Sequence, residues 1–133
     1  MAKVQLRNEI MFKAPTRVGL LADVAEALDS AGVNIDAIGA YDKGSDGEFL
    51  ILTSNNRVVG QALERLGGEV GMVPVVVAEV PNQPGELAVI ARRLADAGIN
   101  VAQIHGTSTD ASTMTLVLLT SDETKVIGLL EDL

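Results

Sequence analysis

The sequence is a tandem duplication with an interval of 66 residues. Residues 16–21 correspond to residues 82–87, and residues 31–35 correspond to residues 97–101. Because the corresponding segments lie before and after one apolar helical stretch, both ends of a helix are repeated. The chain of 133 residues is therefore predicted to form two units of similar length.

Hydrophobic periodicity predicts the same order of elements in each unit. Residues 4–13 alternate between apolar and polar, with Leu6 on the apolar side and Glu9 on the polar side, which is typical of a strand with one buried face. Asn8, in the middle of this strand, is expected to mark the point where the neighbouring strand changes. Further strands are expected over residues 33–38, 48–53, 69–80, 99–104 and 114–120, with turns at residues 42–47 and near Asp110.

Four helices are predicted by apolar residues at helical spacing. The four stripes are Leu21, Val24, Ala25 and Leu28; Val59, Ala62, Leu63 and Leu66; Leu87, Ile90, Ala91 and Leu94; and Val126, Leu129, Leu130 and Leu133. Ser54, Asn55 or Asn56 is expected to cap the second helix, and Thr120 with Glu123 has the spacing of a capping box before the fourth.

The predicted fold class is α+β, with two ferredoxin-like units of the order strand-helix-strand-strand-helix-strand. We expect residues 1–68 to form the first unit and residues 69–133 the second. The second unit ends after its last helix, one strand short. We therefore expect residues 69–73 to supply the fourth strand of the first unit and residues 3–7 that of the second. The result would be a six-stranded antiparallel sheet with four helices on one face.

The strands also bear on assembly. Residues 49–52, 75–77 and 116–119 are continuously apolar, a pattern typical of sheets covered on both faces. Helices on one face would leave the other face open. The sequence therefore predicts a homodimer or larger assembly that buries the open face.

Composition argues against several classes of partner and of chemistry. The net charge of −8 and the lack of a basic cluster argue against nucleic acid. There is no cysteine, so disulfides and Cys-based metal sites are excluded. Residues 1–5 lack the apolar core of a signal peptide, and no apolar run is long enough to span a bilayer. We expect a cytoplasmic protein with no membrane partner, no cofactor and no metal.

The repeated junctions resemble those of ACT domains, the small ligand-binding modules found with enzymes of amino-acid metabolism. The resemblance is carried in the second unit by Asn82-x-Pro84-Gly85-x-Leu87, by Ile90 and Leu94, and by the run Gly98-Ile99-Asn100-Val101. The first unit keeps Gly19, Leu21, Gly32, Val33 and Asn34 but has Thr16 and Val18 at positions where Asn or Asp and Pro are usual. The resemblance covers essentially the whole chain.

This resemblance implies a ligand site between two units, against the loop before the first helix of one of them. Glycine lets a backbone approach a ligand closely, and the free amides of a helix N-terminus suit an α-carboxylate. The second unit has the better match, so the sequence favours one competent site there and a degraded or differently selective one in the first. The implied ligand-binding residues are Asn82, Gln83, Pro84, Gly85, Glu86, Leu87 and Asn100, with Arg17, Val18, Gly19, Leu20 and Asn34 as the twin.

Each of these residues also has an ordinary structural interpretation as a turn, a helix start or a helix stop. The lone His105 is interpreted as an exposed loop residue rather than a ligand contact. Residues 42–48 faintly match a calcium loop, but Thr53 replaces the Glu that such a loop requires, so a hairpin turn is favoured.

Two functional hypotheses remain. The first is a stand-alone regulatory protein that binds an amino acid and acts on a separate enzyme or pathway. The second is an oligomerisation or interaction module whose ACT-like units have lost their ligand. A catalytic role is disfavoured because the sequence shows no nucleophile-base pair, metal cluster or phosphate loop.

Overall fold

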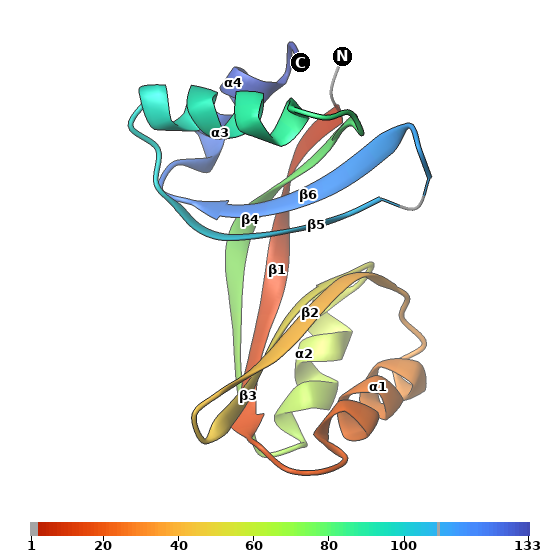
Figure 1. The fold of residues 1–133 in the computed structure, drawn as a ribbon. Coiled ribbons are helices and arrows are strands. Elements are labelled where there is room, and N and C mark those ends of the chain that lie inside the picture. The colour runs from red at the N-terminus through yellow and green to blue at the C-terminus, as the bar shows by residue number, and fades with distance from the viewer. Residues whose placement is uncertain (1–2, 109) are drawn as a thin grey trace. The chain divides into compact units, whose positions relative to one another are not determined.

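A computed structural model describes residues 3–108 and 110–133 of the chain. It contains six strands and four helices in the predicted order (Figure 1). The elements are β1 (Lys3–Pro15), α1 (Leu20–Ser30), β2 (Ile35–Lys43), β3 (Asp46–Thr53), α2 (Asn56–Glu64), β4 (Glu69–Pro81), α3 (Glu86–Asp96), β5 (Val101–Thr107), β6 (Thr113–Thr120) and α4 (Glu123–Leu130).

The chain divides into two compact units that exchange strand segments. The first unit is residues 8–73, and the second unit is residues 1–7 together with residues 74–133. The hydrogen-bonded strand order is β2-β3-β1-β4-β6-β5. Each unit thus closes its sheet with one part of β1 and one part of β4. The predicted α+β fold, including the fourth strand that the N-terminal segment supplies to the second unit, is confirmed.

The first unit buries one face of its sheet under α1 and α2. In the register of β1 with β3, Ile10 lies opposite Ile51 and Phe12 opposite Phe49, so these four residues share one face. The Phe12 and Phe49 ring centroids are 6.0 Å apart. The helices add Leu20, Val24, Leu28, Val59 and Leu63 to this core.

The stripes predicted for α1 and α3 are wrong at half of their positions, because Leu21, Ala25, Leu87 and Ala91 are exposed. In α1, Leu20 takes the core position predicted for Leu21.

The second unit repeats this arrangement with aliphatic side chains only. Its core joins residues of β4 and β6 to the inner faces of α3 and α4. Val4, from the N-terminal segment, packs against that core. The buried members are Val76, Ala78, Val80, Ile90, Leu94, Leu116, Leu118, Val126 and Leu130.

The simple alternation predicted for β1 is wrong at its middle. Leu6, expected on the buried side, is 55% exposed, and Glu9, expected on the polar side, is 1% exposed. Both residues flank the point between Arg7 and Asn8 where the strand leaves one unit for the other. One continuous period cannot describe a strand that serves two different cores, and Leu6 belongs to neither.

Both hairpins are longer than predicted. β2 begins at Ile35 and continues to Lys43, which pairs with Asp46, so the expected turn over residues 42–47 contracts around Gly44. Gly44 adopts a left-handed φ of 68°, which permits a tight reversal. The hairpin interpretation of this segment is therefore confirmed. β5 likewise extends to Thr107, which places His105 within a strand, half-buried, and not in a loop.

The helix caps follow the repeat. Asn55 caps α2 by accepting a hydrogen bond from the Val58 amide, and Asp122 caps α4 through the Lys125 amide. The capping box predicted from Thr120 and Glu123 is wrong, because Thr120 is still the last residue of β6. Asp122 lies 67 positions after Asn55, the same offset that relates β6 to β3.

The apolar residues on the other face of the sheet are also buried. Leu50 and Leu52 alternate with the core residues of β3, yet they are only 6% and 1% exposed. Val117, in β6, is 3% exposed. The homodimer stays a prediction.

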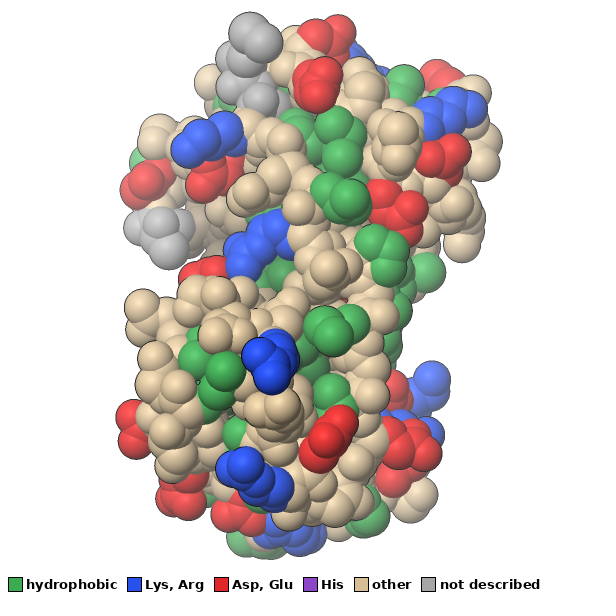
Figure 2. Space-filling model, turned by 180° about the vertical axis from the view of Figure 1, so that it is seen from behind, with side chains coloured by type: hydrophobic (Ala, Val, Ile, Leu, Met, Phe, Trp, Pro, Cys, Tyr) green, Lys and Arg blue, Asp and Glu red, His purple; other side chains and the backbone are tan. Residues whose placement is uncertain are grey.

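The surface carries mixed charge. On the face shown in Figure 2, Lys and Arg side chains stand apart from one another among acidic side chains. Within the described ranges, no helix has the length and apolar character needed to cross a membrane.

The contact of Gly68 with β1 gives a test of the first core. A Cβ added at Gly68 would lie 2.6 Å from both the Lys13 carbonyl oxygen and Phe12 Cε1. We predict that Gly68→Ala lowers the free energy of unfolding by about 1–3 kcal/mol, because backbone and ring must shift to admit the methyl group. Urea unfolding monitored by circular dichroism measures the change.

Gly71→Ala is the matched control, because a Cβ there would meet nothing within 4 Å. We expect its free energy of unfolding to stay within about 1 kcal/mol of the parent. Equal destabilisation by the two substitutions would contradict the close approach at Gly68.

Candidate functional site

The loop between the first strand and first helix of each unit has the same backbone conformation. Gly19 precedes α1 with φ 91°, and Gly85 precedes α3 with φ 89°. These left-handed values strongly favour glycine over any residue with a Cβ. The two glycines that anchor the sequence motif are therefore required by the backbone itself.

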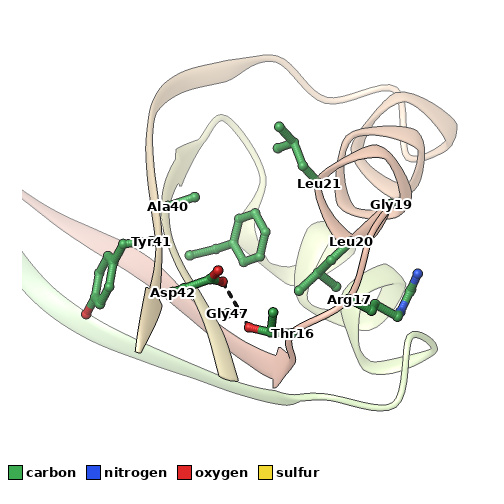
Figure 3. Close-up of a pocket in the computed structure, with 10 residues that line it drawn as sticks. Thr16, Arg17, Gly19, Leu20, Leu21, Ala40, Tyr41, Asp42 and Gly47 are labelled. Carbon is green, nitrogen blue, oxygen red and sulfur yellow. Dashed lines mark hydrogen bonds between the residues drawn. The ribbon is translucent and has the colours of Figure 1, made fainter. Parts of the chain in front are cut away.

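A cavity of about 360 Å³ opens beside the loop of the first unit. It lies between the start of α1, the end of β2 and the beginning of β3 (Figure 3). Its apolar wall includes Leu20, Ala40 and Phe49. The remaining lining residues are Thr16, Arg17, Gly19, Leu21, Tyr41, Asp42 and Gly47.

The polar wall of this cavity is built by Thr16 and Asp42. The Thr16 hydroxyl donates to Asp42 Oδ1 at 2.9 Å, and the Thr16 amide donates to the Ser45 carbonyl at 2.8 Å. The loop is thereby fixed to the β2–β3 hairpin. Within residues 3–108 and 110–133, Asp42 takes part in no ion pair. Its carboxylate can therefore receive a cationic group.

Arg17 is turned away from this polar wall. Its guanidinium forms an ion pair with Asp23 in the first turn of α1. In Figure 3 the Arg17 and Tyr41 side chains point away from the space between Thr16, Asp42 and Leu20. Val18, at the tip of the loop, is fully exposed. Of the predicted residues of this loop, Gly19 and Leu20 border the cavity most directly.

The loop of the second unit is engaged with its own hairpin. The Asn82 amide donates to the Ser112 carbonyl at 3.0 Å, and Asn82 Nδ2 donates to the Asp110 carbonyl at 3.4 Å. Hydrogen bonds from the Ser112 hydroxyl, the Ser112 amide and the Thr113 amide hold the pKa of Asp110 below its ordinary value. The Asn82 side chain thus has a structural partner in this unit.

The rest of this loop is more open to solvent. Gln83, Pro84 and Gly85 are exposed, and Leu87 is 48% exposed. Glu86 is half-buried at the first position of α3.

The two predicted asparagines lie away from the loops within their units. Asn34 follows the C-terminal end of α1, and Asn100 follows that of α3. An eleven-residue helix, about 16 Å long, therefore separates each from the loop before it. Asn100 forms two hydrogen bonds with Ser121: its amide donates to Ser121 Oγ, and its carbonyl accepts from the Ser121 amide. No single unit brings these asparagines to its own loop.

Sequence reasoning missed the β2 side of the cavity. The sequence pattern assigns Asp42 and Gly47 only to a hairpin turn or a weak calcium-loop match, and it gives Ala40 no role. The strand topology could have predicted that the end of β2 contributes to the site. β1 and β2 both run antiparallel to β3, so the end of β2 and the loop after β1 lie at the same end of the sheet.

Two minor candidates gain no support from the geometry. His105 lies in β5 opposite Val117 of β6. In the described part of the chain, no group of three or more His, Cys, Asp or Glu side chains could hold a metal ion.

Comparison with known proteins identifies both units. The ACT-domain family model matches twice, over residues 8–70 and 75–133. The comparison with curated proteins found no match.

Several solved structures share the fold at low sequence identity. A protein from Bacteroides thetaiotaomicron superposes with a TM-score of 0.87 at 21% identity, covering 97% of this chain and 89% of that one. The ligand-free regulatory subunit of aspartate kinase from Thermus thermophilus gives a TM-score of 0.72 at 19% identity, covering 97% and 95%. Its counterpart from Thermus flavus gives 0.69 at 18% identity, covering 98% and 95%.

Two family matches span nearly the whole chain, and each falls within one of the two structural units. The chain belongs to the ACT-domain family and carries two ACT domains in tandem.

Proposed function

We propose that this protein is a regulatory sensor that binds an amino acid at the loop before α1 or α3 and acts on a separate enzyme or pathway. The observation that carries the proposal is the cavity beside the first of these loops. The resemblance to ACT domains also implies an effector site at this loop. The protein's role is then regulatory and not catalytic.

The groups around the cavity suit a small zwitterion. The amides of Leu21 and Ala22 lie in the first turn of α1, where helix geometry leaves N–H groups without a carbonyl partner, so they suit a carboxylate. Asp42 suits an ammonium group. Leu20 and Phe49 offer an apolar surface to a side chain. A volume near 360 Å³ is at the small end for ligand pockets, which favours a single amino acid.

The remaining residues that the motif implies stay candidates. Asn34 and Asn100 lie at the far ends of their helices, so they would reach an effector only from another unit or another copy. The full proposed set is Arg17, Val18, Gly19, Leu20, Asn34, Asn82, Gln83, Pro84, Gly85, Glu86, Leu87 and Asn100.

The output of such a sensor is a change in the population of two states. An effector shifts an equilibrium only by as much as its affinity for the two states differs. The regulatory subunits of aspartate kinase that share this fold make an enzyme of amino-acid metabolism a fitting class of partner. Nucleic acid fits poorly, given the net charge of −8.

An interaction platform without a ligand is the second candidate function. β2 is an edge strand, so one side of its backbone is unpaired. It also carries three exposed large side chains, Ile35, Ile38 and Tyr41, which are 41%, 42% and 43% exposed. These features favour pairing with a second copy, and the homodimer is proposed on this strand.

Ligand binding is tested by thermal shift with each of the standard amino acids. We predict that at least one stabilises the protein, by about 2.7 kcal/mol at a hundredfold excess over its Kd. Asp42→Asn should raise the Kd of that amino acid about tenfold, because the ammonium group loses its charged partner. Asp29→Asn, at the far end of α1, removes the same charge and should leave the affinity unchanged.

The corresponding 2-oxo acid lacks the ammonium group and should bind weakly to the parent protein. The Asp42→Asn variant should bind this 2-oxo acid with no lower affinity than the parent does, because the ligand has no ammonium group to pair with Asp42. A silent panel would contradict the sensor and leave the platform as the function. Equal changes in affinity for Asp42→Asn and Asp29→Asn would show that Asp42 does not bind the amino acid.

Assembly is tested by multi-angle light scattering at micromolar concentration. We predict a mass twice the 13.9 kDa of one chain. Ile38→Lys should shift the protein toward monomer, because it places a charge on the exposed edge strand β2. Ile104→Lys is the matched control on the other edge strand, β5, which carries a single exposed large apolar residue. A monomeric parent protein would contradict the homodimer.

A further inference from the structure

The two units differ at the positions that shape the cavity. We propose that the first unit alone holds the effector, and that Met114 and Glu86 close the corresponding place in the second unit. This inference rests on the proposed function and states which of the two sites serves it. It reverses the ranking that the loop motif alone gives, because the second unit has the better motif.

Equivalent positions follow from the strand registers. Gly47 of β3 lies opposite Ala14 of β1. In the second unit, Met114 of β6 lies opposite Val80 of β4, and Val80 is 66 residues after Ala14. Met114 therefore stands where the first unit has Gly47.

Gly47 is what leaves the first cavity open. A Cβ added there would lie 2.8 Å from Leu20 Cδ2, 3.7 Å from Asp42 Oδ1 and 3.8 Å from Phe49 Cε1. All three neighbours line the cavity. A longer side chain at this position would therefore occupy the space between them or push Leu20 into it.

Met114 supplies such a side chain in the second unit. It is half-buried and packs against the second core. Methionine fills irregular gaps readily, because it is unbranched and has three rotatable bonds. The position that Gly47 leaves vacant is thus taken up by core packing in the second unit.

A second pair of positions points the same way. Ala40 lines the first cavity opposite Phe49, and its counterpart is Gly106 opposite Leu116. A Cβ at Gly106 would lie 2.6 Å from Leu116 Cδ2. The Leu116 side chain therefore lies against β5 at the place where β2 presents a methyl group to the cavity.

The polar groups differ as well. Leu20, buried beside the first cavity, corresponds to Glu86 at the start of α3. The Glu86 carboxylate interacts favourably with the helix N-terminus and repels a second anion there. Asp42 corresponds to Ser108, which has no charge for an ammonium group. The second unit therefore lacks counterparts of Gly47 and Asp42, which give the first cavity its space and its negative charge.

Amide NMR of the full-length ¹⁵N-labelled protein tests this assignment. The protein is titrated with each standard amino acid at millimolar concentration. We expect the one that binds to shift amides of residues 16–21 and 40–49 and to leave residues 82–87 in place. Gly47→Met should raise the Kd of that amino acid more than about tenfold, because the methionine side chain fills the cavity.

Ala40→Leu fills the same cavity from β2 and serves as the second variant if Gly47→Met does not fold. Met114→Leu is the matched control in the second unit; it preserves core volume and should keep the parent affinity. Shifts confined to residues 82–87, or parent affinity in both Gly47→Met and Ala40→Leu, would overturn this assignment and leave the sensor function standing. An absence of shifts with all amino acids would overturn the assignment and the sensor function together.

Discussion

The fold depends on two long strands that each serve two hydrophobic cores. β1 contributes Val4 to the core of the second unit and Ile10 and Phe12 to that of the first. β4 contributes Val70 to the first core and Val76 to the second. Neither half of the chain contains all the strands of its own sheet. The duplication therefore yields two ACT domains that complete each other through exchanged strand segments.

The sequence was sufficient for the parts of the fold that rest on period and repeat. The four helices, the strand order and the supply of residues 3–7 to the second unit follow from the hydrophobic period and the offset of 66. The stripes on α1 and α3 were right only in part, because Leu21 and Leu87 are exposed. Reasoning failed where a local pattern meets a tertiary boundary. Leu6 and Glu9 break the alternation where β1 passes between units, and Thr120 remains in β6 instead of starting a cap.

The candidate site was predictable only in part, for a related reason. A motif such as Pro84-Gly85 reports the backbone of a loop, and that backbone is the same in both units. It does not report what fills the space beneath the loop. That space is set by residues from other strands, Gly47 in one unit and Met114 in the other, which no local pattern connects to the loop. The better motif and the open cavity consequently occur in different units.

One effector per chain is the central claim of this account. Isothermal titration calorimetry of the unmodified protein with the amino acid that stabilises it measures the stoichiometry directly. The account predicts one equivalent per chain, whether the chain is a monomer or half of a dimer. Two equivalents per chain would contradict it, because both loops would then bind despite Met114 and Glu86.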